Sequence, residues 1–372
     1  MKFIDDVAGL DAVVAALKGK TRIYLDTEFD SSRRGTELCL VQVTAGEEVF
    51  VIDAQTIGDL RPLRGVLGGK SVEWILHAGR QDVELLLGAL GFEWPPTVFD
   101  TQLAWALQSA EHQVSLAYLQ AKLLGVQPPK GHQTDDWTRR PLSDDMRAYA
   151  AGDVAHLPAL YDKLAAGLAA RGRPAGIVAA ATQEAYAPAD ETTSALSLSS
   201  FRNLWQLDAP QRAALAWLVD WYNGLDGDEQ ETAPNRKALF AIAARLPETK
   251  TALRQLKGVP RRFADQHGGA VVEGMLAAAQ AAPADEAPPT PPPAYATFDE
   301  MYRDAWLQCA RIDVCGAVEI APELALPGPW MRKLREAIGD GTAFVAAAEQ
   351  LTGWRALLVE PWRAFCAATG LR

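Results

Sequence analysis

Residues 22–29 read Arg22-Ile23-Tyr24-Leu25-Asp26-Thr27-Glu28-Phe29, a β-type run with two acidic residues, Asp26 and Glu28, near its end. Two more β-type runs follow at residues 39–43 and 49–53, separated by short polar or glycine-containing turns. Runs of β-branched and aromatic residues between turn residues are typical of strands. We therefore predict a meander of three strands, in which Asp26 and Glu28 share one face because side chains alternate along a strand.

The residues beyond the meander alternate between strand and helix patterns. We predict a strand at residues 73–77, a helix over 81–90 and a short strand at 98–100. Leucines then recur at helical intervals, and a further helix begins near Ser143. This order predicts an α/β domain over residues 1–172.

The rest of the chain is predicted to be helical, with one proline-rich interruption. That segment cannot supply helix donors and favours an extended polyproline conformation, which makes it a semi-rigid linker. Similar helical units on both sides suggest a diverged internal duplication. The predicted parts are a helical connector at 173–204, a helical domain at 205–282, the linker at 283–294 and a second, diverged helical domain at 295–372.

The composition excludes several classes of protein. Hydrophobic residues make up 49% and charged residues 22% of the 372 residues, which excludes a disordered or fibrous chain. The net charge of −11 argues against a polycation that coats nucleic acid, although local basic patches remain compatible with it. Four cysteines without C-x-x-C spacing, no signal-peptide pattern and no long apolar run lead us to expect a soluble, cytoplasmic protein without membrane contact.

Two pairs of side chains can carry chemistry, and each pair has a structural alternative. Asp26 and Glu28 are like charges on one strand face, which is costly without a cation; taken alone, two solvent-facing acids on an edge strand are the favoured interpretation. Tyr149 and Asp153 stand four residues apart on a helix that Ser143 can cap, so the phenol and the carboxylate share one face. A core tyrosine above a surface acid explains that spacing equally well.

Two further acids follow predicted strands. Asp82 lies after a strand and a glycine turn, where side chains project over the end of an α/β sheet. An acid in a first helical turn is also a common partner of the helix dipole, so both interpretations stay open. For Asp100, which precedes Thr101, we expect helix N-capping.

In their order along the chain, these residues resemble the motifs of one enzyme family. An Asp-x-Glu strand, a later Asp and a Tyr-x-x-x-Asp helix form the pattern of the DEDD exonucleases, in the subgroup marked by tyrosine. The resemblance is most specific to the ribonuclease D family and spans residues 1 to about 172. The matching words are Asp26-Thr27-Glu28-Phe29, His77-Ala78-Gly79, Phe99-Asp100-Thr101-Gln102, Lys130-x-x-Gln133-x-x-Asp136-Trp137-x-x-Arg140-Pro141-Leu142 and Tyr149-Ala150-Ala151-x-Asp153-Val154.

The resemblance implies a ribonuclease H-like fold and a 3′–5′ exoribonuclease that releases 5′-mononucleotides. It also implies two divalent ions, usually Mg²⁺ or Mn²⁺, held by Asp26, Glu28, Asp82 and Asp153, with Asp82 acting directly or through water. Tyr149 would orient the attacking water. Hard dications take oxygen ligands, and two of them neutralise four carboxylates. The implied partner is RNA with an accessible 3′ end, such as transfer RNA precursors, and we expect a monomer.

The same motifs supply candidate substrate-binding residues. Phe29 would stack unpaired 3′ bases or pack in the core. His77 would contact the substrate or the end of the sheet. The other candidates are Thr27, Lys130, Gln133 and Arg140, of which the last three would hold the RNA backbone or have surface and capping roles.

Two residues depart from the family pattern. Asp135 stands where serine is common and adds negative charge near the expected phosphate path, which would alter substrate preference. Gly152 stands where alanine is frequent and costs about 0.5–1 kcal/mol of local helix stability. We expect activity to be retained.

Residues 205–282 resemble the HRDC domain, the helicase-and-ribonuclease-D C-terminal module, mostly at core positions such as Trp221. Family members often carry a basic residue directly after that position, where this chain has Tyr222. Residues 295–372 look like a second, more diverged copy. Five basic residues form a candidate RNA-contact patch or a solvated helical face: Lys250, Arg254, Lys257, Arg261 and Arg262.

Two other functions fit these motifs. The same fold serves 3′–5′ exonucleases that act on DNA, and backbone groups that contact a 2′-hydroxyl leave no mark in the sequence. A non-catalytic RNA-binding protein that keeps the fold is the other alternative. The presence of all five catalytic residues argues against it.

Overall fold

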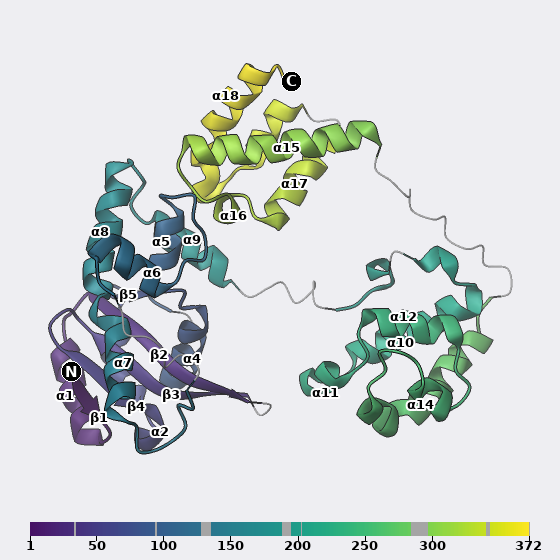
Figure 1. Cartoon of the computed structure of the whole chain (residues 1–372), viewed down its shortest axis with the longest axis horizontal. Helices are drawn as coiled ribbons and strands as arrows, with labels where there is room; N and C mark the ends of the chain where they lie inside the picture. Colours follow the sequence, from purple (N-terminus) through teal and green to yellow (C-terminus); the bar gives the residue numbers. More distant parts are fainter. Residues whose placement is uncertain are drawn as a thin grey trace. The chain divides into compact units, whose positions relative to one another are not determined.

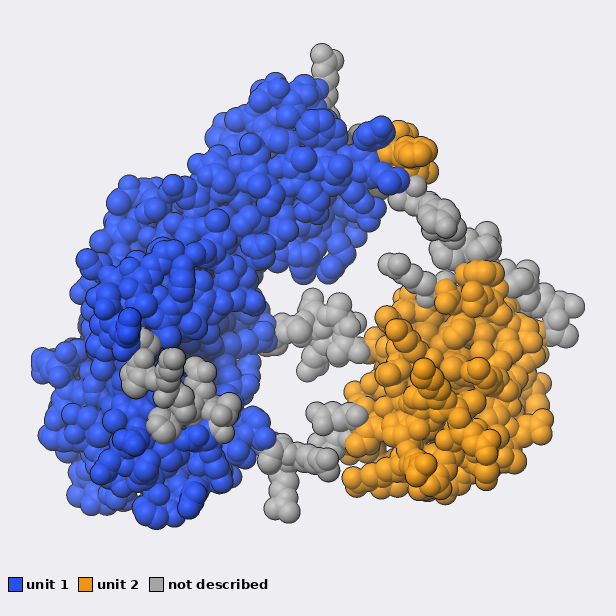
Figure 2. All heavy atoms as spheres, viewed as in Figure 1, with its two compact units in different colours: residues 1–187, 300–372 blue, residues 188–299 orange. Residues whose placement is uncertain are grey.

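The chain forms two compact units in the computed structural model, which describes residues 1–32, 35–93, 95–127, 135–187, 195–201, 203–283, 297–339 and 343–371. Unit 1 consists of residues 1–187 together with 300–372, and unit 2 consists of residues 188–299 (Figure 2). None of the helices in the described ranges combines the length and the apolar character that a membrane crossing requires.

Unit 1 contains one mixed sheet of six strands (Figure 1). The strands are β1 (Lys2–Ile4), β2 (Arg22–Ser32), β3 (Gly35–Thr44), β4 (Val49–Asp53), β5 (Glu73–Leu76) and β6 (Thr97–Asp100), in the order β1-β4-β3-β2-β5-β6. The predicted meander is β2-β3-β4, which pair antiparallel, whereas β1, β5 and β6 join through parallel pairs. The predicted α/β fold class is confirmed. Strand β1 was not predicted, because so short a strand shows no period.

The position of β2 overturns one interpretation of its two acids. This strand pairs with β3 on one side and with β5 on the other. The interpretation of Asp26 and Glu28 as acids of an edge strand is therefore wrong. An inner strand is covered on both faces in an α/β fold, so acids there need a partner.

Helices cover both faces of the sheet (Figure 1). Those before residue 188 are α1 (Val7–Leu17), α2 (Ala54–Ile57), η1 (Arg61–Leu63), α3 (Arg64–Leu67), α4 (Arg80–Leu90), α5 (Thr101–Ala106), α6 (Leu116–Leu119), η2 (Gln120–Leu124), α7 (Asp144–Ala155), α8 (Leu157–Ala170) and α9 (Ile177–Tyr186). Ile23 and Leu25 of β2 lie in the core formed with α1, α3 and α4, whereas Tyr24 lies in the core formed with α5, α8 and α9. The alternation along β2 thus separates two helical layers.

Helix α7 covers the end of β2 that bears the two acids. Asp26 and Glu28 lie on the face of Tyr24, since side chains alternate along the strand. On the neighbouring strand, Leu40 pairs with Glu28 and packs in one small core with Ala150 of α7. Residues of α7 that face the sheet therefore meet the two acids.

The C-terminal helices belong to unit 1 from residue 300 onward. They are α15 (Phe298–Ala317), α16 (Pro322–Ala325), α17 (Gly328–Gly339), η6 (Phe344–Gln350), η7 (Gly353–Leu358) and α18 (Val359–Thr369), and their apolar core is continuous with that of α5, α8 and α9. The Arg355 side chain is 3% exposed and pairs with Glu184 of α9 at 2.5 Å. Its guanidinium lies 4.6 Å and 4.3 Å from the ring centres of Trp330 and Trp354, whose indole N–H groups also donate to Glu184. This buried pair joins the last helices to α9.

Unit 2 is helical. Its elements are η4 (Leu198–Ser200), η5 (Leu204–Gln206), α10 (Ala209–Asn223), α11 (Gly227–Thr232), α12 (Arg236–Arg245), α13 (Lys250–Arg254) and α14 (Arg261–Gln280). Leu215, Leu239 and Phe263 are among the residues of its own apolar core. The domain boundaries proposed from the sequence stay predictions, and all but the first residue of the predicted linker lie outside the described residues.

Candidate active site

Three carboxylates from separate motifs lie together between β2 and α7. Single oxygen atoms of Asp26, Glu28 and Asp153 lie within 4.8 Å of one another. Each of the three residues is half-buried. Among the described residues, the groups that shift the pKa values of these carboxylates include no Lys, Arg or His. We call this group the carboxylate cluster.

Burial and mutual repulsion raise the pKa values of the carboxylate cluster. Burial, followed by the charges of Asp82, Asp153 and Glu28, raises the pKa of Asp26 well above its ordinary value. Burial and the charges of Asp153 and Asp82 raise the pKa of Glu28 to about 8. Burial raises the pKa of Asp153 to about 6, although a hydrogen bond with Tyr149 lowers it. Ionisation of all three near neutral pH is therefore unfavourable unless a cation binds.

The donors of the carboxylate cluster suit hard divalent cations. Such ions take oxygen ligands, carboxylates above all, and tolerate several carboxylates in one site. A cation also removes the electrostatic cost that raises the three pKa values. The cluster therefore fits divalent metal ions.

The start of α7 explains how the helix brings Tyr149 and Asp153 to the cluster. Ser143 accepts a hydrogen bond from the Met146 amide at 3.2 Å, which confirms the predicted N-cap. From that start, the two residues lie one turn apart on one face. The Tyr149 ring lies 6.2 Å from the ring of Trp137, at an interplanar angle of 33°. The structure thus brings together the strand and helix residues predicted from separate motifs.

Asp82 approaches the cluster from the first turn of α4. It is 8% exposed, and its Oδ1 atom accepts hydrogen bonds from the Thr27 amide at 3.0 Å and the Thr27 hydroxyl at 2.6 Å. Burial raises the pKa of Asp82 despite these bonds. After burial, the charge of Asp82 is the largest influence on the pKa of Asp26. Thr27 therefore orients Asp82, while its predicted substrate contact stays a prediction.

Asp100 has the capping role predicted for it. Its Oδ1 accepts hydrogen bonds from the Gln102 amide at 2.8 Å and the Ala78 amide at 3.0 Å. Its Oδ2 accepts a hydrogen bond from the Tyr186 hydroxyl at 2.6 Å. This carboxylate therefore joins the ends of β5 and β6 to α9.

His77 is engaged at the end of β5. One ring nitrogen lies 2.9 Å from the Thr101 hydroxyl and the other lies 3.0 Å from the Val114 carbonyl oxygen. Burial lowers the pKa of the imidazole. Of the two roles considered for His77, these contacts favour the one at the end of the sheet.

Arg140 binds a buried carboxylate on β4. Its Nε and Nη2 atoms lie 2.6 Å and 2.7 Å from the two oxygens of Asp53, and its Nη1 donates to the Trp137 carbonyl at 2.7 Å. The side chains of Arg140 and Asp53 are 26% and 2% exposed. These contacts favour a structural role for Arg140, and its contact with RNA stays a prediction.

The remaining predicted site residues differ in their surroundings. Phe29 is half-buried and directly follows a register irregularity in the pairing of β2 with β3. Asp135 is exposed. A Cβ atom at Gly152 would have no heavy atom within 4 Å beyond its chain neighbours and the backbone of its own helix. Lys130 and Gln133 lie outside the described residues.

The five basic residues of the candidate RNA-contact patch are exposed on unit 2. Arg254 pairs with Asp265 at 3.2 Å, and the ammonium group of Lys250 donates to the Asp265 backbone carbonyl at 2.9 Å. An acid that follows the basic run in the sequence thus engages two members of the patch. Lys257, Arg261 and Arg262 complete it, and RNA binding there stays a prediction.

Sequence reasoning missed three residues that support the site. Asp53 was visible at the end of a strand, but nothing nearby indicated Arg140 as its partner. Thr101 and Tyr186 hold His77 and Asp100. Tyr186 gave no signal, because its partner lies 86 residues away along the chain.

Comparisons with known proteins agree with the α/β fold of an exonuclease. A family model described as 3′–5′ exonuclease matches residues 1–169. Ribonuclease D of Gluconacetobacter diazotrophicus is 32% identical over 359 residues, which cover 87% of this chain and 88% of that protein. Ribonuclease D of Escherichia coli is 31% identical over 292 residues, 75% of each chain.

A solved structure extends the likeness over the whole chain. The crystal structure of Escherichia coli RNase D, described as an exoribonuclease involved in structured RNA processing, superposes with a TM-score of 0.75 at 25% identity. The superposition covers 99% of this chain and 98% of that one. This chain belongs to the ribonuclease D family of 3′–5′ exoribonucleases.

Proposed function

We propose that this exoribonuclease uses two divalent ions, Mg²⁺ or Mn²⁺, to hydrolyse the terminal phosphodiester at RNA 3′ ends and release 5′-mononucleotides. The carboxylate cluster carries the proposal, because its oxygens lie within 4.8 Å of one another and the pKa values of all three acids are raised. Like charges held this closely in a half-buried site need a cation.

Four acidic side chains would hold the ions. Asp26, Glu28 and Asp153 would bind directly, and Asp82, oriented by Thr27, would bind directly or through water. Two bound divalent ions supply a clamp that stabilises the attacking and leaving oxygens of an in-line displacement. Water is the nucleophile, so no activated serine or cysteine is required.

Tyr149 would orient the attacking water. Its hydrogen bond with Asp153 keeps the phenol at the carboxylate cluster. The neighbouring Trp137 is 2% exposed and restricts the positions available to the phenol ring. Phe29, half-buried and directly after Glu28, would stack the terminal base.

We further propose that the substrates are structured RNAs, transfer RNA precursors among them, and that the protein acts as a monomer in the cytoplasm. The description of the Escherichia coli relative as an enzyme of structured RNA processing supports this substrate class. All four cysteines are free thiols, which fits a reducing compartment. The exposed patch of Lys250, Arg254, Lys257, Arg261 and Arg262 would add phosphate contacts.

The decisive experiment compares Asp26→Asn with Asp11→Asn in the full chain. Asp11 is an exposed acid of α1 that undergoes the same chemical change away from the cluster. Changes to groups that merely support metal ligands cost about 10- to 100-fold, so loss of a ligand should lower the rate by more than about 100-fold. The measurement is the Mg²⁺-dependent shortening of RNA labelled at its 5′ end, because hydrolysis from the 3′ end leaves the label on the remaining strand.

The same assay separates the alternatives. Undiminished hydrolysis by Asp26→Asn would refute the assignment of the cluster. Faster digestion of a matched DNA 3′ overhang than of the RNA would favour a DNA exonuclease. Tight RNA binding by the unaltered protein without metal-dependent hydrolysis would favour a non-catalytic RNA-binding role.

A further inference from the structure

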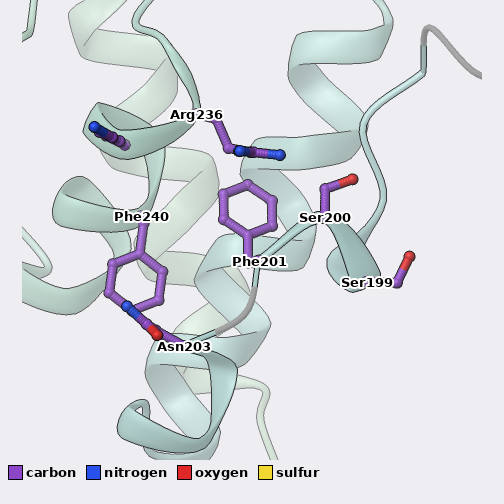
Figure 3. A pocket seen from close by; sticks show the side chains of 7 residues that line it. Ser199, Ser200, Phe201, Asn203, Arg236 and Phe240 are labelled. Carbon is purple, nitrogen blue, oxygen red and sulfur yellow. The ribbon is translucent and has the colours of Figure 1, made fainter. Parts of the chain in front are cut away.

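Unit 2 contains a pocket that the proposed hydrolysis does not use. Its volume is about 600 Å³, and its lining consists of Ser199, Ser200, Phe201, Asn203, Arg236, Lys237 and Phe240 (Figure 3). Pockets of roughly 300–1,000 Å³ accommodate small organic ligands, so this one can take a nucleotide. We call it the unit 2 pocket.

Two aromatic rings form one side of the unit 2 pocket. The ring centres of Phe201 and Phe240 lie 6.4 Å apart, and their planes differ by 22°. Phe201 is 6% exposed and belongs to the apolar core of unit 2, so its position is fixed. Phe240 packs against that core but is only partly buried. Phe240 therefore has one part that packs against the core and another part that is exposed. The exposed part of an aromatic ring held in this way is a platform on which a base can stack.

Basic residues border the same pocket. Arg236 and Lys237 are exposed in the first turn of α12, and Figure 3 shows the Arg236 side chain beside the Phe201 ring. The start of a helix is the unfavourable end for cations, because the helix dipole is positive there. Helix stability therefore does not explain these two side chains, whereas an anion bound in the pocket would.

The sequence continues this positive character beyond the pocket. From residue 236 to residue 262 there are eight Arg and Lys residues and one acid, Glu248. Gly258, at φ 89°, brings the turn after α13 against α12, since a Cβ atom there would lie 3.2 Å from Ala238. Lys257 thus belongs to a turn that contacts the helix turn bearing Arg236 and Lys237. The basic residues at the start of α12 and in the turn after α13 therefore lie on neighbouring segments of unit 2.

We propose that the unit 2 pocket binds unpaired nucleotides of the RNA substrate. One base stacks on the exposed part of the Phe240 ring, and Arg236 and Lys237 bind the adjoining phosphates. Ser199, Ser200 and Asn203 supply hydrogen-bonding groups at the rim. Stacking tolerates any base and phosphate contacts carry no sequence information, so the pocket holds RNA irrespective of sequence. The proposal rests on RNA as the substrate, and no hydrolysis takes place in this pocket.

The test measures RNA binding by the full chain in the presence of EDTA, so that hydrolysis does not interfere. The probe is a fluorescent single-stranded RNA 12-mer, compared with an abasic strand of the same length by fluorescence anisotropy. Stacking of one base is worth about 1–3 kcal/mol, so Phe240→Leu should weaken binding about 5- to 150-fold. Phe240→Tyr, which keeps the ring, should bind the RNA as the wild type does. The abasic strand should bind the wild type more weakly than the RNA does. Phe240→Leu should not weaken binding of the abasic strand further, because that strand has no base to stack on the ring.

A second variant tests the phosphate contacts without touching the core. Arg236→Gln combined with Lys237→Gln should lower the slope of log K against log salt by about 1.4, because each phosphate contact of a single strand contributes about 0.7. Arg245→Gln, an exposed change in the last turn of the same helix and outside the pocket, is the matched control. It should change the affinity far less than the double variant.

The outcomes separate this proposal from the proposed function. Wild-type affinity and salt dependence in the double variant would overturn the pocket as an RNA site, even if Phe240→Leu failed to fold. Loss of affinity in the double variant, with a folded Phe240→Leu that binds normally, would overturn the stacking. Either result leaves hydrolysis intact, whereas failure of the proposed function would appear as normal turnover by Asp26→Asn.

Discussion

Asp53 and the carboxylate cluster lie in the same sheet, yet their surroundings differ in one respect. Leu40 of β3 pairs with Glu28 on one side and with Asp53 on the other, so the two regions share one row across the sheet. Burial alone would raise the pKa of Asp53, but hydrogen bonds from Arg140 and Thr56 and the charge of Arg140 lower it. The cluster has no such cation among the described residues that shift its pKa values, and those values are raised.

The contrast teaches which buried acid is structural. The carboxylate of Asp53 receives its cation from the protein itself, and the pair ties the segment before α7 to β4. For the carboxylates of the cluster, the proposed function assigns this role to divalent cations from solution. The role of a buried acid in this fold, structural or metal-binding, is therefore indicated by the group that pairs with it and not by its burial alone.

The largest expected effect on stability comes from removing the internal cation. Arg140→Gln leaves the Asp53 carboxylate buried and unpaired, which costs about 3–5 kcal/mol. Because Arg140 is 26% exposed, we expect about 3 kcal/mol, the lower end of that range. Urea unfolding of the full chain, followed by tryptophan fluorescence, measures the change. Arg139→Gln, at the exposed neighbouring position, is the control, and equal midpoints for the two variants would contradict the assignment.

The carboxylate cluster, unlike the Arg140–Asp53 pair, should gain stability from added metal ions. Mg²⁺ at about a hundred times its dissociation constant should stabilise the wild type by about 2.7 kcal/mol. Arg140→Gln should keep this gain, since its change lies outside the cluster, whereas Asp26→Asn should lose most of it. In EDTA, Asp26→Asn should be more stable than the wild type, because one of the repelling charges is gone. Thermal unfolding with and without Mg²⁺ decides between these outcomes, and a full Mg²⁺ gain in Asp26→Asn would show that the ions bind elsewhere.

The two regions should also give opposite pH dependences in the metal-free protein. The folded pKa of Glu28 is about 8, above its ordinary value of 4.5, so the folded state holds more protons between these values and stability falls as pH rises through that window. The folded pKa of Asp53 lies below its ordinary value of 3.8, so its stabilisation is present above that value and is lost as pH falls.

Both pH dependences are measured by unfolding the protein in EDTA at a series of pH values from acidic to alkaline. Asp26→Asn should flatten the slope between about pH 4.5 and 8, since it removes one of the coupled charges. Arg140→Gln should remove the acid-side loss and leave the other slope in place. Stability that rises through the higher window would contradict the raised pKa values.

Local sequence predicted the parts of the site whose geometry depends on near neighbours. Alternation along β2 placed Asp26 and Glu28 on one face, and Ser143 and Asp100 are helix caps because their side chains reach the next turn. These two relations depend on strand and helix periods, which the sequence carries directly. That Asp153 would join the two acids was implied by the resemblance to the ribonuclease D family and by no local period.

Contacts between distant segments could not be predicted in this way. Arg140 and Asp53 are 87 residues apart, and Arg355 and Glu184 are 171 residues apart. The proline-rich run indicated a boundary, but not that the helices after it share a core with α5, α8 and α9. Such pairings depend on how the completed helices pack on the sheet, and no short sequence pattern predicts that packing.

The smallest expected effect concerns the helix that brings Asp153 to the cluster. Gly152→Ala should raise the free energy of unfolding by about 0.5–1 kcal/mol, because alanine loses less backbone entropy in a helix. A Cβ atom there meets no heavy atom within 4 Å beyond its chain neighbours and the backbone of its own helix, so activity should be unchanged. Gly88→Ala in α4, equally open, is the matched control for stability. Both changes could stabilise the protein while only Gly152→Ala slows hydrolysis. That result would contradict unchanged activity and would indicate that the RNA occupies the space beside Gly152, next to the carboxylate cluster.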